Sequence, residues 1–304
     1  MDKIKAFAHY LAQNKIPAAT DVPLSEWSTF HIGGPAALFI QPGSSEQIAT
    51  ALSYADREEI PLMVLGVGSN ILFADEGYPG AVLHLGEHFA QIQLEGEGII
   101  GAQAGAKLSD LCEFAQRHGL AGLEFAYGIP GSVGGALYMN AGAYGGQMED
   151  VTLSASFVSS TGQPQEFAAG QMGFGYRRSA FMQMRGALTG GRFKLTPAPP
   201  EEIRARMDEY MARRVEKQPL ELPSAGSMFK RPEGNYASAL IDQCGLKGLQ
   251  VGGAAVSEKH AGFIVNLGGA TCKDVLELIA QVQQQVKAKT GYELECEVQV
   301  RGGK

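Results

Sequence analysis

The chain has 304 residues and a net charge of −7, with 45% hydrophobic and 19% charged residues. This length allows two or three domains or subdomains, and the composition excludes an intrinsically disordered chain. The acidic balance argues against a nucleic-acid partner, because nucleic-acid binding depends on a basic surface.

Cysteine and histidine spacing gives no indication of a metal centre. The four cysteines lie far apart and form no C-x-x-C pair, and the six histidines occur singly. We therefore expect reduced thiols and no metal. The N-terminus lacks the apolar core of a signal peptide, and no stretch has the ~18 apolar residues of a membrane span. The sequence thus predicts a soluble, cytoplasmic protein that does not bind membranes.

The first half of the chain is predicted to mix helices and strands. An amphipathic pattern predicts a helix over 1–16, and a Ser44 cap predicts a second helix over 44–60. A third helix is expected over 107–119, closed by its final glycine. Apolar runs predict strands over 36–40, 61–65, 81–85, 92–96 and 99–106.

The second half opens with a glycine-rich stretch, 126–146, that has little helical periodicity. Alternation around a Thr-Gly turn predicts a hairpin over 151–167, and acids at the start with bases at the end predict a helix over 199–218. The remaining predicted elements are helices near 235–244 and 271–289 and a strand over 294–302. Because helices and strands do not alternate regularly, an α+β fold is favoured over a doubly wound sheet.

The first candidate ligand loop is VLGVGSN, residues 64–70. A dinucleotide fingerprint would need a third glycine opening a helix, but position 71 is isoleucine, and no G-K-[ST] of a P-loop follows. The backbone N–H groups of a Gly-x-Gly-Ser-Asn loop can form an anion nest for a pyrophosphate. A plain tight turn is the alternative that these residues leave open.

Two further stretches combine glycine or arginine with apolar neighbours. The stretch 127–150 contains seven glycines and is too apolar for a linker. We expect either backbone that lies against a large ligand or a buried irregular connection. Tyr176, Arg177 and Arg178 lie in an apolar setting, where a buried arginine would need a ligand anion. The alternative is a structural salt bridge plus one solvated arginine.

Two C-terminal motifs carry candidate acids. Ser227, in PSAGSMFKRP, lacks the G-x-S-x-G context of an esterase nucleophile. Glu293, Glu295 and Glu297 alternate along the last predicted strand, and each taken singly is typical of a solvated strand face.

Taken together, the motifs resemble the UDP-N-acetylenolpyruvoylglucosamine reductase family, FAD enzymes of bacterial peptidoglycan synthesis. In chain order they are STFHIGGPA, VLGVGSN, GIPGSVGGALYMNAGAYG, GYRRSAF, AGSMFKRP and ECEVQVRG. The resemblance extends from about Ser28 to Arg301. The chain resembles the shorter form of the family, because only about 50 residues separate Arg177 from Ser227. Arg178 departs from the acid or other polar residue expected at its position.

The resemblance implies a vanillyl-alcohol-oxidase-type fold. Two α+β FAD-binding subdomains would span 1–80 and 81–200, and an α+β substrate-binding domain would span 201–304. Non-covalent FAD is implied, with contacts from two glycine-rich segments: Gly66, Gly68, Ser69, Asn70, Pro130, Gly131, Ser132, Gly134, Asn140, Ala141 and Gly142.

The resemblance also implies a reaction and its catalytic residues. NADPH would reduce UDP-N-acetylglucosamine enolpyruvate to UDP-N-acetylmuramate by way of FAD. Arg177 would stabilise charge on the substrate carboxylate, Ser227 would donate a proton, and Glu297 would act as a protonated acid or orient another donor. Glu297 is preferred to Glu295 because the family motif has an acid followed directly by valine. The residues expected to bind substrate are Tyr144, Tyr176 and Lys230.

Two other functions remain open from the sequence. The first is an oxidase of the same fold, which would attach its flavin covalently through His31. The second is a sugar-nucleotide-binding protein without flavin or activity. For the reductase we expect a monomer.

Overall fold

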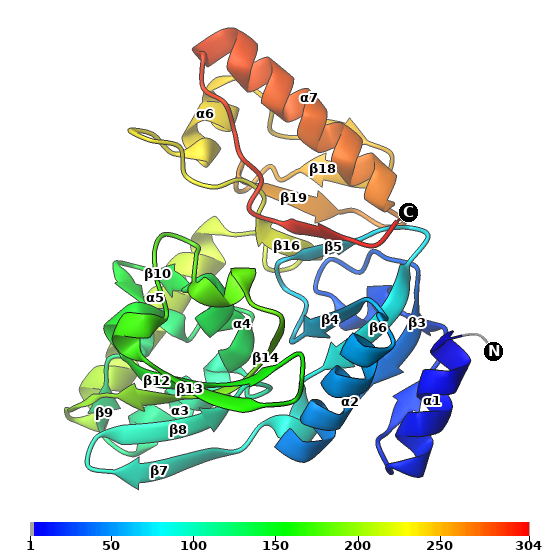
Figure 1. Ribbon diagram of the computed structural model, residues 1–304. Helices are drawn as coiled ribbons and strands as arrows, with labels where there is room; N and C mark the ends of the chain where they lie inside the picture. The colour runs from blue at the N-terminus through cyan, green and yellow to red at the C-terminus, as the bar shows by residue number, and fades with distance from the viewer. Residues whose placement is uncertain (1–2, 304) are drawn as a thin grey trace. The chain divides into compact units, whose positions relative to one another are not determined.

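The computed structural model describes residues 3–303, which form two compact units (Figure 1). Unit 1 contains residues 3–21, 37–67 and 80–212, and unit 2 contains residues 22–36, 68–79 and 213–303. The first 80 residues therefore contribute two short segments to the unit that contains the C-terminus. The division into 1–80, 81–200 and 201–304 stays a prediction.

The helices lie where hydrophobic periodicity predicts them, with one addition. Ser44 caps the second helix as expected, because its Oγ accepts a hydrogen bond from the Gln47 N–H at 3.3 Å. The α-helices of the described residues are α1 (Lys3–Gln13), α2 (Ser45–Arg57), α3 (Leu108–Arg117), α4 (Val133–Met139), α5 (Pro200–Lys217), α6 (Ala237–Gln243) and α7 (Cys272–Thr290). The addition is α4, which lies inside the glycine-rich stretch.

The first sheet carries the strand that leads into the VLGVGSN loop. Its order is β1 (Ala18–Ala19), β3 (Pro35–Ile40), β6 (Tyr78–His84) and β4 (Leu62–Leu65), and β2 (Val22–Pro23) pairs with β3. β4 runs parallel to β6. In unit 1 the core beside this sheet includes Phe7 of α1 and Ile48 of α2, both with no exposed surface.

The second sheet of unit 1 is antiparallel throughout. Its order is β13 (Pro164–Ala168), β12 (Thr152–Ser159), β14 (Gly186–Lys194), β8 (Ile99–Gln103) and β7 (Ile92–Gly96). β12 and β13 form the predicted hairpin, whose turn contains Gly162 at a φ of +81°. Alternate side chains such as Ala155 and Phe157 enter a core that also contains Leu111 of α3 and Leu137 of α4.

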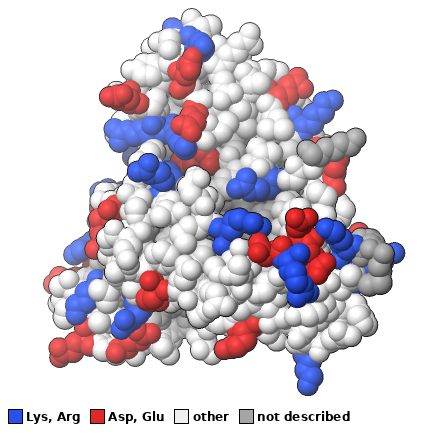
Figure 2. Space-filling model, viewed as in Figure 1, with Lys and Arg blue, Asp and Glu red and all other residues white. Residues whose placement is uncertain are grey.

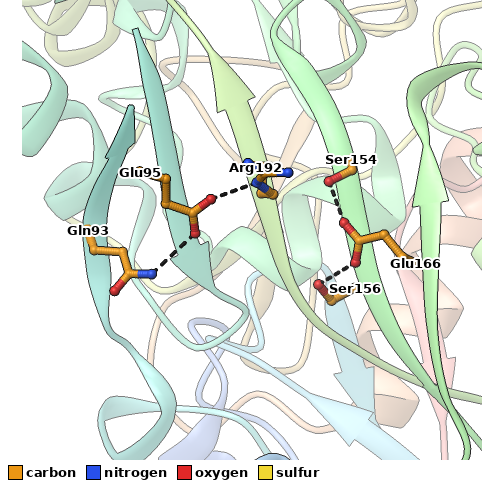
Figure 3. Close-up of polar contacts among 6 residues, drawn as sticks. All are labelled: Gln93, Glu95, Ser154, Ser156, Glu166 and Arg192. Atoms are coloured by element: carbon orange, nitrogen blue, oxygen red, sulfur yellow. Dashed lines mark hydrogen bonds and ion pairs between the residues drawn. The ribbon is translucent and has the colours of Figure 1, made fainter. Parts of the chain in front are cut away.

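The opposite face of this sheet is polar in the part drawn in Figure 3, whereas Val158 and Ala187 of the sheet pack into the core that contains α2. Glu95 of β7 pairs with Arg192 of β14 at 2.6 Å, across the intervening strand β8. Glu166 of β13 accepts hydrogen bonds from the Ser154 and Ser156 hydroxyl groups of β12 at 2.5 and 2.8 Å. In this part of the sheet, the period-2 alternation of the sequence thus separates a packed face from a hydrogen-bonded one.

Unit 2 contains a four-stranded antiparallel sheet and a parallel strand pair. The sheet order is β16 (Ser224–Ser227), β19 (Phe263–Asn266), β18 (Ala254–Val256) and β17 (Gln250–Val251). β5 (Ile71–Phe73) pairs in parallel with β20 (Gln299–Arg301). The core of this unit includes Ile241 of α6 and Val282 of α7, but also Phe30 and Leu72 from the first quarter of the chain.

One helix was not predicted, and one predicted strand is too long. The stretch 126–146 has little helical periodicity but contains α4. The last strand does not begin at residue 294, because only Gln299–Arg301 is paired as a strand and Cys296 forms a single bridge with Phe229. Two short pairs complete the described fold: β9 (Leu120–Ala121) with β15 (Thr196–Pro197), and β10 (Gly142–Ala143) with β11 (Gly146–Gln147).

Basic and acidic side chains are mixed on the face shown in Figure 2, with uncharged areas between them. Among the described residues, no helix combines the length and the apolar character needed to cross a membrane. Mixed helices and mostly antiparallel strands confirm the predicted α+β class.

Candidate active site

The glycines of the VLGVGSN loop are sterically required. A Cβ added at Gly66 would lie 2.2 Å from Ser132 Oγ, inside unit 1. Gly68 has a φ of +72°, and an added Cβ would lie 2.3 Å from the Trp27 carbonyl oxygen, inside unit 2. The contact at Gly68 is with backbone, which only glycine allows there, and the contact at Gly66 is with the hydroxyl that caps α4. The loop is therefore more specialised than an ordinary turn.

The second glycine-rich segment folds into α4 and the turns around it. Ser132 caps α4, with its Oγ accepting from the Gly135 N–H at 3.4 Å. The N–H groups of Val133 and Gly134 donate to the carbonyl oxygens of Ala106 and Ala104, both at 2.8 Å. Pro130 and Gly131 directly precede this cap, and the Gly131 carbonyl accepts from the Leu108 N–H. These contacts fix the start of α4 against the loop between β8 and α3.

The end of α4 leads into the β10–β11 hairpin. Asn140 ends the helix at a φ of +44° and is buried, and the following Ala141 donates its N–H to the Ala136 carbonyl at 2.9 Å. Tyr144 lies between β10 and β11 at a φ of +54°. Its ring stacks on Tyr210 of α5, with centroids 4.5 Å apart and planes 8° apart. The hairpin is thereby held against α5.

Arg177 lies in a tight turn between Gly175 and Arg178. These two residues exchange backbone hydrogen bonds of 3.0 and 3.1 Å, and Arg177 takes a φ of +51°. Arg177 Nη2 donates to the Gly142 carbonyl at 3.0 Å, and its guanidinium lies 5.3 Å from the centre of the Tyr176 ring. Tyr176 and Arg178 are exposed and Arg177 is half-buried, so Arg178 is the solvated arginine that the sequence left open. Tyr176, Arg177 and Arg178 lie at a turn, and their apolar neighbours face inward instead.

Ser227 and Glu297 are brought close together inside unit 2. Just after β16, the Met228 carbonyl accepts from the Glu297 N–H at 2.9 Å, and Lys230 N–H donates to the Glu295 carbonyl at 2.8 Å. Backbone pairing therefore places residue 227 beside the segment that carries Glu297. Ser227 is exposed and Glu297 is half-buried.

The two neighbouring acids have different surroundings. Glu295 is mostly exposed and forms an ion pair of 2.5 Å with Lys230. The backbone carbonyl of Glu297 instead accepts from Asn70 Nδ2 at 3.3 Å, and Asn70 accepts from the Gln299 N–H at 3.0 Å. Between the acids, burial raises the pKa of the Cys296 thiol and Glu295 adds to the increase, so the thiol stays protonated. The end of the VLGVGSN loop is thus attached to the Glu297 segment.

The residues of the first glycine loop fit a bound cofactor. Ser28, whose Cα would lie 2.9 Å from a Cβ at Gly68, is 5% exposed, and within residues 3–303 its Oγ has no hydrogen-bond partner. A buried hydroxyl without a partner is uncommon and is consistent with a ligand acceptor or donor at this loop. Ser28 and Tyr210 were not singled out from the sequence, since neither a lone hydroxyl nor a helical tyrosine carries a spacing signal.

Other candidate chemistry is limited in the described part of the chain. Residues 3–303 contain no group of three or more His, Cys, Asp or Glu side chains arranged to hold a metal ion. All four cysteines are free thiols. His31 is exposed and has a φ of +55°.

Comparison with known proteins first defines a class. Residues 36–168 match the FAD binding domain family, and residues 218–301 match the UDP-N-acetylenolpyruvoylglucosamine reductase C-terminal domain. The fold is similar to that of 4-ethylphenol oxidase from Gulosibacter chungangensis, with a TM-score of 0.50 and 16% identity over 97% of this chain and 64% of the other. The chain is thus a flavoprotein of the vanillyl-alcohol-oxidase fold, as predicted.

Full-length relatives narrow the class to one family. UDP-N-acetylenolpyruvoylglucosamine reductase of Syntrophomonas wolfei is 46% identical over 92% of this chain and 93% of its own, and that of Listeria monocytogenes is 45% identical over the same shares. The crystal structure of the reductase from Thermus caldophilus has a TM-score of 0.80 and 38% identity, covering 94% of this chain and 99% of the other. The chain belongs to the UDP-N-acetylenolpyruvoylglucosamine reductase family.

Proposed function

We propose that this protein reduces UDP-N-acetylglucosamine enolpyruvate to UDP-N-acetylmuramate, with FAD as cofactor and NADPH as reductant, in peptidoglycan synthesis. Family membership supports the overall reaction. The observation that carries the catalytic assignment is the Met228–Glu297 backbone pair, which brings a hydroxyl and a carboxyl group onto adjacent segments.

When bound, FAD supplies hydride transfer from NADPH to the substrate. We assign its binding to the loop 66–70 and to Pro130, Gly131, Ser132, Gly134, Ala141 and Gly142. The close packing at Gly66 and Gly68 supports this assignment, because a side chain at either position would displace the loop. The orphaned Ser28 hydroxyl lies beside the same loop.

Arg177 stabilises the charge that develops on the substrate. Adding a hydride to the terminal carbon of the enolpyruvyl double bond moves an electron pair onto the carboxylate, giving an enediolate. A guanidinium stays charged and matches a carboxylate through two parallel hydrogen bonds. Because the enediolate carries more charge than the starting carboxylate, Arg177 stabilises the transition state more than the ground state.

Ser227 completes the reaction as a proton donor. Its O–H bond breaks as a C–H bond forms at the ether-bearing carbon, and the enediolate electron pair becomes that C–H bond. Ser227 is exposed, so water can return the proton to its oxygen. Glu297 either carries a proton or orients another donor, since an ionised carboxylate would repel the enediolate.

Substrate binding is assigned to Tyr144, Tyr176 and Lys230. Tyr144 and Tyr176 have 37% and 56% of their surface exposed, and these exposed parts would contact a sugar or a uracil. Lys230 pairs with the mostly exposed Glu295, so a substrate diphosphate would compete with Glu295 for the ammonium group. We further propose that the protein acts as a cytoplasmic monomer and that its product supports cell shape and division.

Replacement of Ser227 tests the catalytic assignment. In Ser227→Ala, reoxidation of the NADPH-reduced protein by UDP-N-acetylglucosamine enolpyruvate should slow by ~10²–10⁴-fold, because a positioned general acid contributes about that much. Reduction by NADPH should stay near the parent rate. Anaerobic stopped-flow absorbance at the flavin bands measures the two half-reactions separately.

Ser224→Ala, at the other end of β16, is the matched control and should leave both half-reactions near the parent rates. An equal loss in both half-reactions of Ser227→Ala contradicts the proton-donor role. If the reduced parent protein is not reoxidised by this substrate at all, the proposed reaction itself is wrong.

A further inference from the structure

Asn140 occupies a conformation that asparagine adopts more readily than most residues. It ends α4 with φ and ψ of 44° and 58°, and only 1% of its surface is exposed. Glycine would satisfy this left-handed backbone at lower cost, so the conformation alone does not require an amide side chain.

The Asn140 amide connects two segments that are distant in sequence. Its Oδ1 accepts from the Glu149 N–H at 2.9 Å, after the β10–β11 hairpin. Its Nδ2 donates to the Gly175 carbonyl at 3.1 Å, with longer contacts of 3.3 Å to Gln147 Oε1 and 3.4 Å to Glu149 Oε2. Only an amide offers both an acceptor and two donors in this geometry.

The Gly175 carbonyl belongs to the turn that presents Arg177. Gly175 and Arg178 close that turn with their mutual backbone bonds, and Arg177 is held at its tip with a positive φ. On the far side of the turn, the buried Ser179 donates its hydroxyl to the Tyr138 carbonyl at 2.7 Å. The end of α4 therefore holds both sides of the Arg177 turn.

The guanidinium is fixed from the same region. Arg177 Nη2 donates to the carbonyl of Gly142, two residues after Asn140. A single stretch, 138–142, thus sets the position of the turn through Tyr138 and Asn140 and the direction of the guanidinium through Gly142.

We propose that Asn140 is a positioning residue for Arg177 rather than a contact to the cofactor. This inference rests on the proposed function, in which Arg177 stabilises the enediolate. A left-handed, non-glycine residue at the tip of a turn stays there only while its surroundings hold it. Without the Asn140 donor the turn relaxes, and the guanidinium no longer meets the substrate carboxylate.

Asn140→Asp is the primary test, because it conserves size and tolerance of the left-handed conformation but removes both amide donors. We expect reoxidation of the reduced protein by UDP-N-acetylglucosamine enolpyruvate to slow about 10- to 100-fold, as small misplacements of a catalytic group do. Reduction by NADPH and the dissociation constant of FAD should change less than threefold. Asn14→Asp is the control. Asn14 follows α1, and its side-chain amide donates a hydrogen bond to the Tyr10 carbonyl, so this variant also removes an amide donor. Both of its half-reactions should match those of the parent.

A double-mutant cycle separates positioning from general damage. If Asn140 acts through Arg177, then Asn140→Asp in an Arg177→Lys background should slow reoxidation less than threefold further. If the slowing caused by Asn140→Asp and the slowing caused by Arg177→Lys multiply in the double variant, the proposal is wrong. Loss of FAD from Asn140→Asp, or an equal slowing of its two half-reactions, also overturns it. Asn140→Gly, which keeps the backbone conformation, should reproduce the result if Asn140→Asp does not fold.

Hydrogen exchange gives a readout that does not depend on the reaction. In Asn140→Asp, the amides of the turn around residues 175–178 should exchange at least tenfold faster, while those of α3 keep the parent rate. Unchanged exchange in this turn overturns the proposal even if the activity falls. If the parent fails to turn over this substrate, the proposed function is wrong, and the exchange result still decides whether Asn140 holds the turn.

Discussion

His84 shows how burial changes a single residue in this fold. It lies at the end of β6, where its ring stacks on Phe39 with centroids 5.4 Å apart. Burial lowers the pKa of His84 from 6.5 to about 4, and repulsion from His88 adds to the decrease. The folded protein therefore keeps this ring neutral at pH 5, where the unfolded chain binds a proton.

His84 should make the protein less stable as the pH falls. The folded-state pKa lies below the unfolded value, so the unfolded chain gains protons first and stability is lost between pH 6.5 and about 4. His84→Phe keeps an aromatic stack but removes the titrating ring. Over this pH interval the parent should lose up to ~3 kcal/mol more of its free energy of unfolding than this variant does. Urea unfolding at several pH values measures this difference, with pH 8 as the packing reference. An equal loss in both proteins contradicts the prediction.

Three residues of the candidate site have a left-handed backbone without being glycine: Asn140, Tyr144 and Arg177. Each lies in a chain reversal: after α4, between β10 and β11, and between Gly175 and Arg178, respectively. Sequence patterns identified these residues by type but not by conformation. Left-handed asparagine is common, whereas left-handed arginine and tyrosine have to be held by long-range contacts that local sequence does not encode.

At the scale of elements, α7 has two sets of N-terminal caps. Its own capping box joins Thr271 and Asp274, with hydrogen bonds of 3.1 and 3.0 Å. Asp75, far away in the sequence, accepts from the N–H groups of Cys272 and Lys273 at 2.7 and 3.1 Å. The first turn of α7 is thereby satisfied, and the carboxylate also favours the positive end of the helix dipole.

Asp75→Ala should destabilise the protein by roughly 1–2 kcal/mol, because it removes a charged cap from two backbone donors. Thermal or urea unfolding measures the change. Glu76→Ala is the matched control, since its side chain is an exposed acid at the next position, and should stay within about 0.5 kcal/mol of the parent. A loss of similar size in both variants would show that charge in this loop matters and capping does not.

Sequence patterns predicted elements well where amphipathic periodicity was long, as in α2, α5 and α7. They missed α4 because it is only seven residues long and contains two glycines, so it depends on the Ser132 cap and on packing against β14. They made the last strand too long because Glu293, Glu295 and Glu297 alternate. The segment 294–298 in fact pairs with residues 228–230 only through the Phe229–Cys296 bridge and the backbone hydrogen bonds on either side of it. Non-local pairing decided both cases.

At the scale of the whole molecule, neither compact unit is one continuous stretch of the chain. Unit 2 combines the C-terminal residues with segments 22–36 and 68–79. Phe30, Ile32 and Leu72 lie in its core, and Asn266 Nδ2 donates to the Phe30 carbonyl at 3.1 Å. No local pattern in the C-terminal sequence reveals that its core and one of its strand pairs need residues from the first quarter of the chain.

The fragment 201–304, which follows the boundary inferred from the sequence, should therefore not fold alone. It lacks β5, the parallel partner of β20, and the Asp75 cap of α7, and three side chains are missing from its core. A unit of about 100 residues has little stability to spare for such losses. We expect no cooperative urea transition by circular dichroism and rapid amide exchange in α7, whereas the full chain shows both a transition and protection. A cooperative transition in the fragment would mean that the C-terminal segment is an autonomous domain and that the two N-terminal segments only dock onto it.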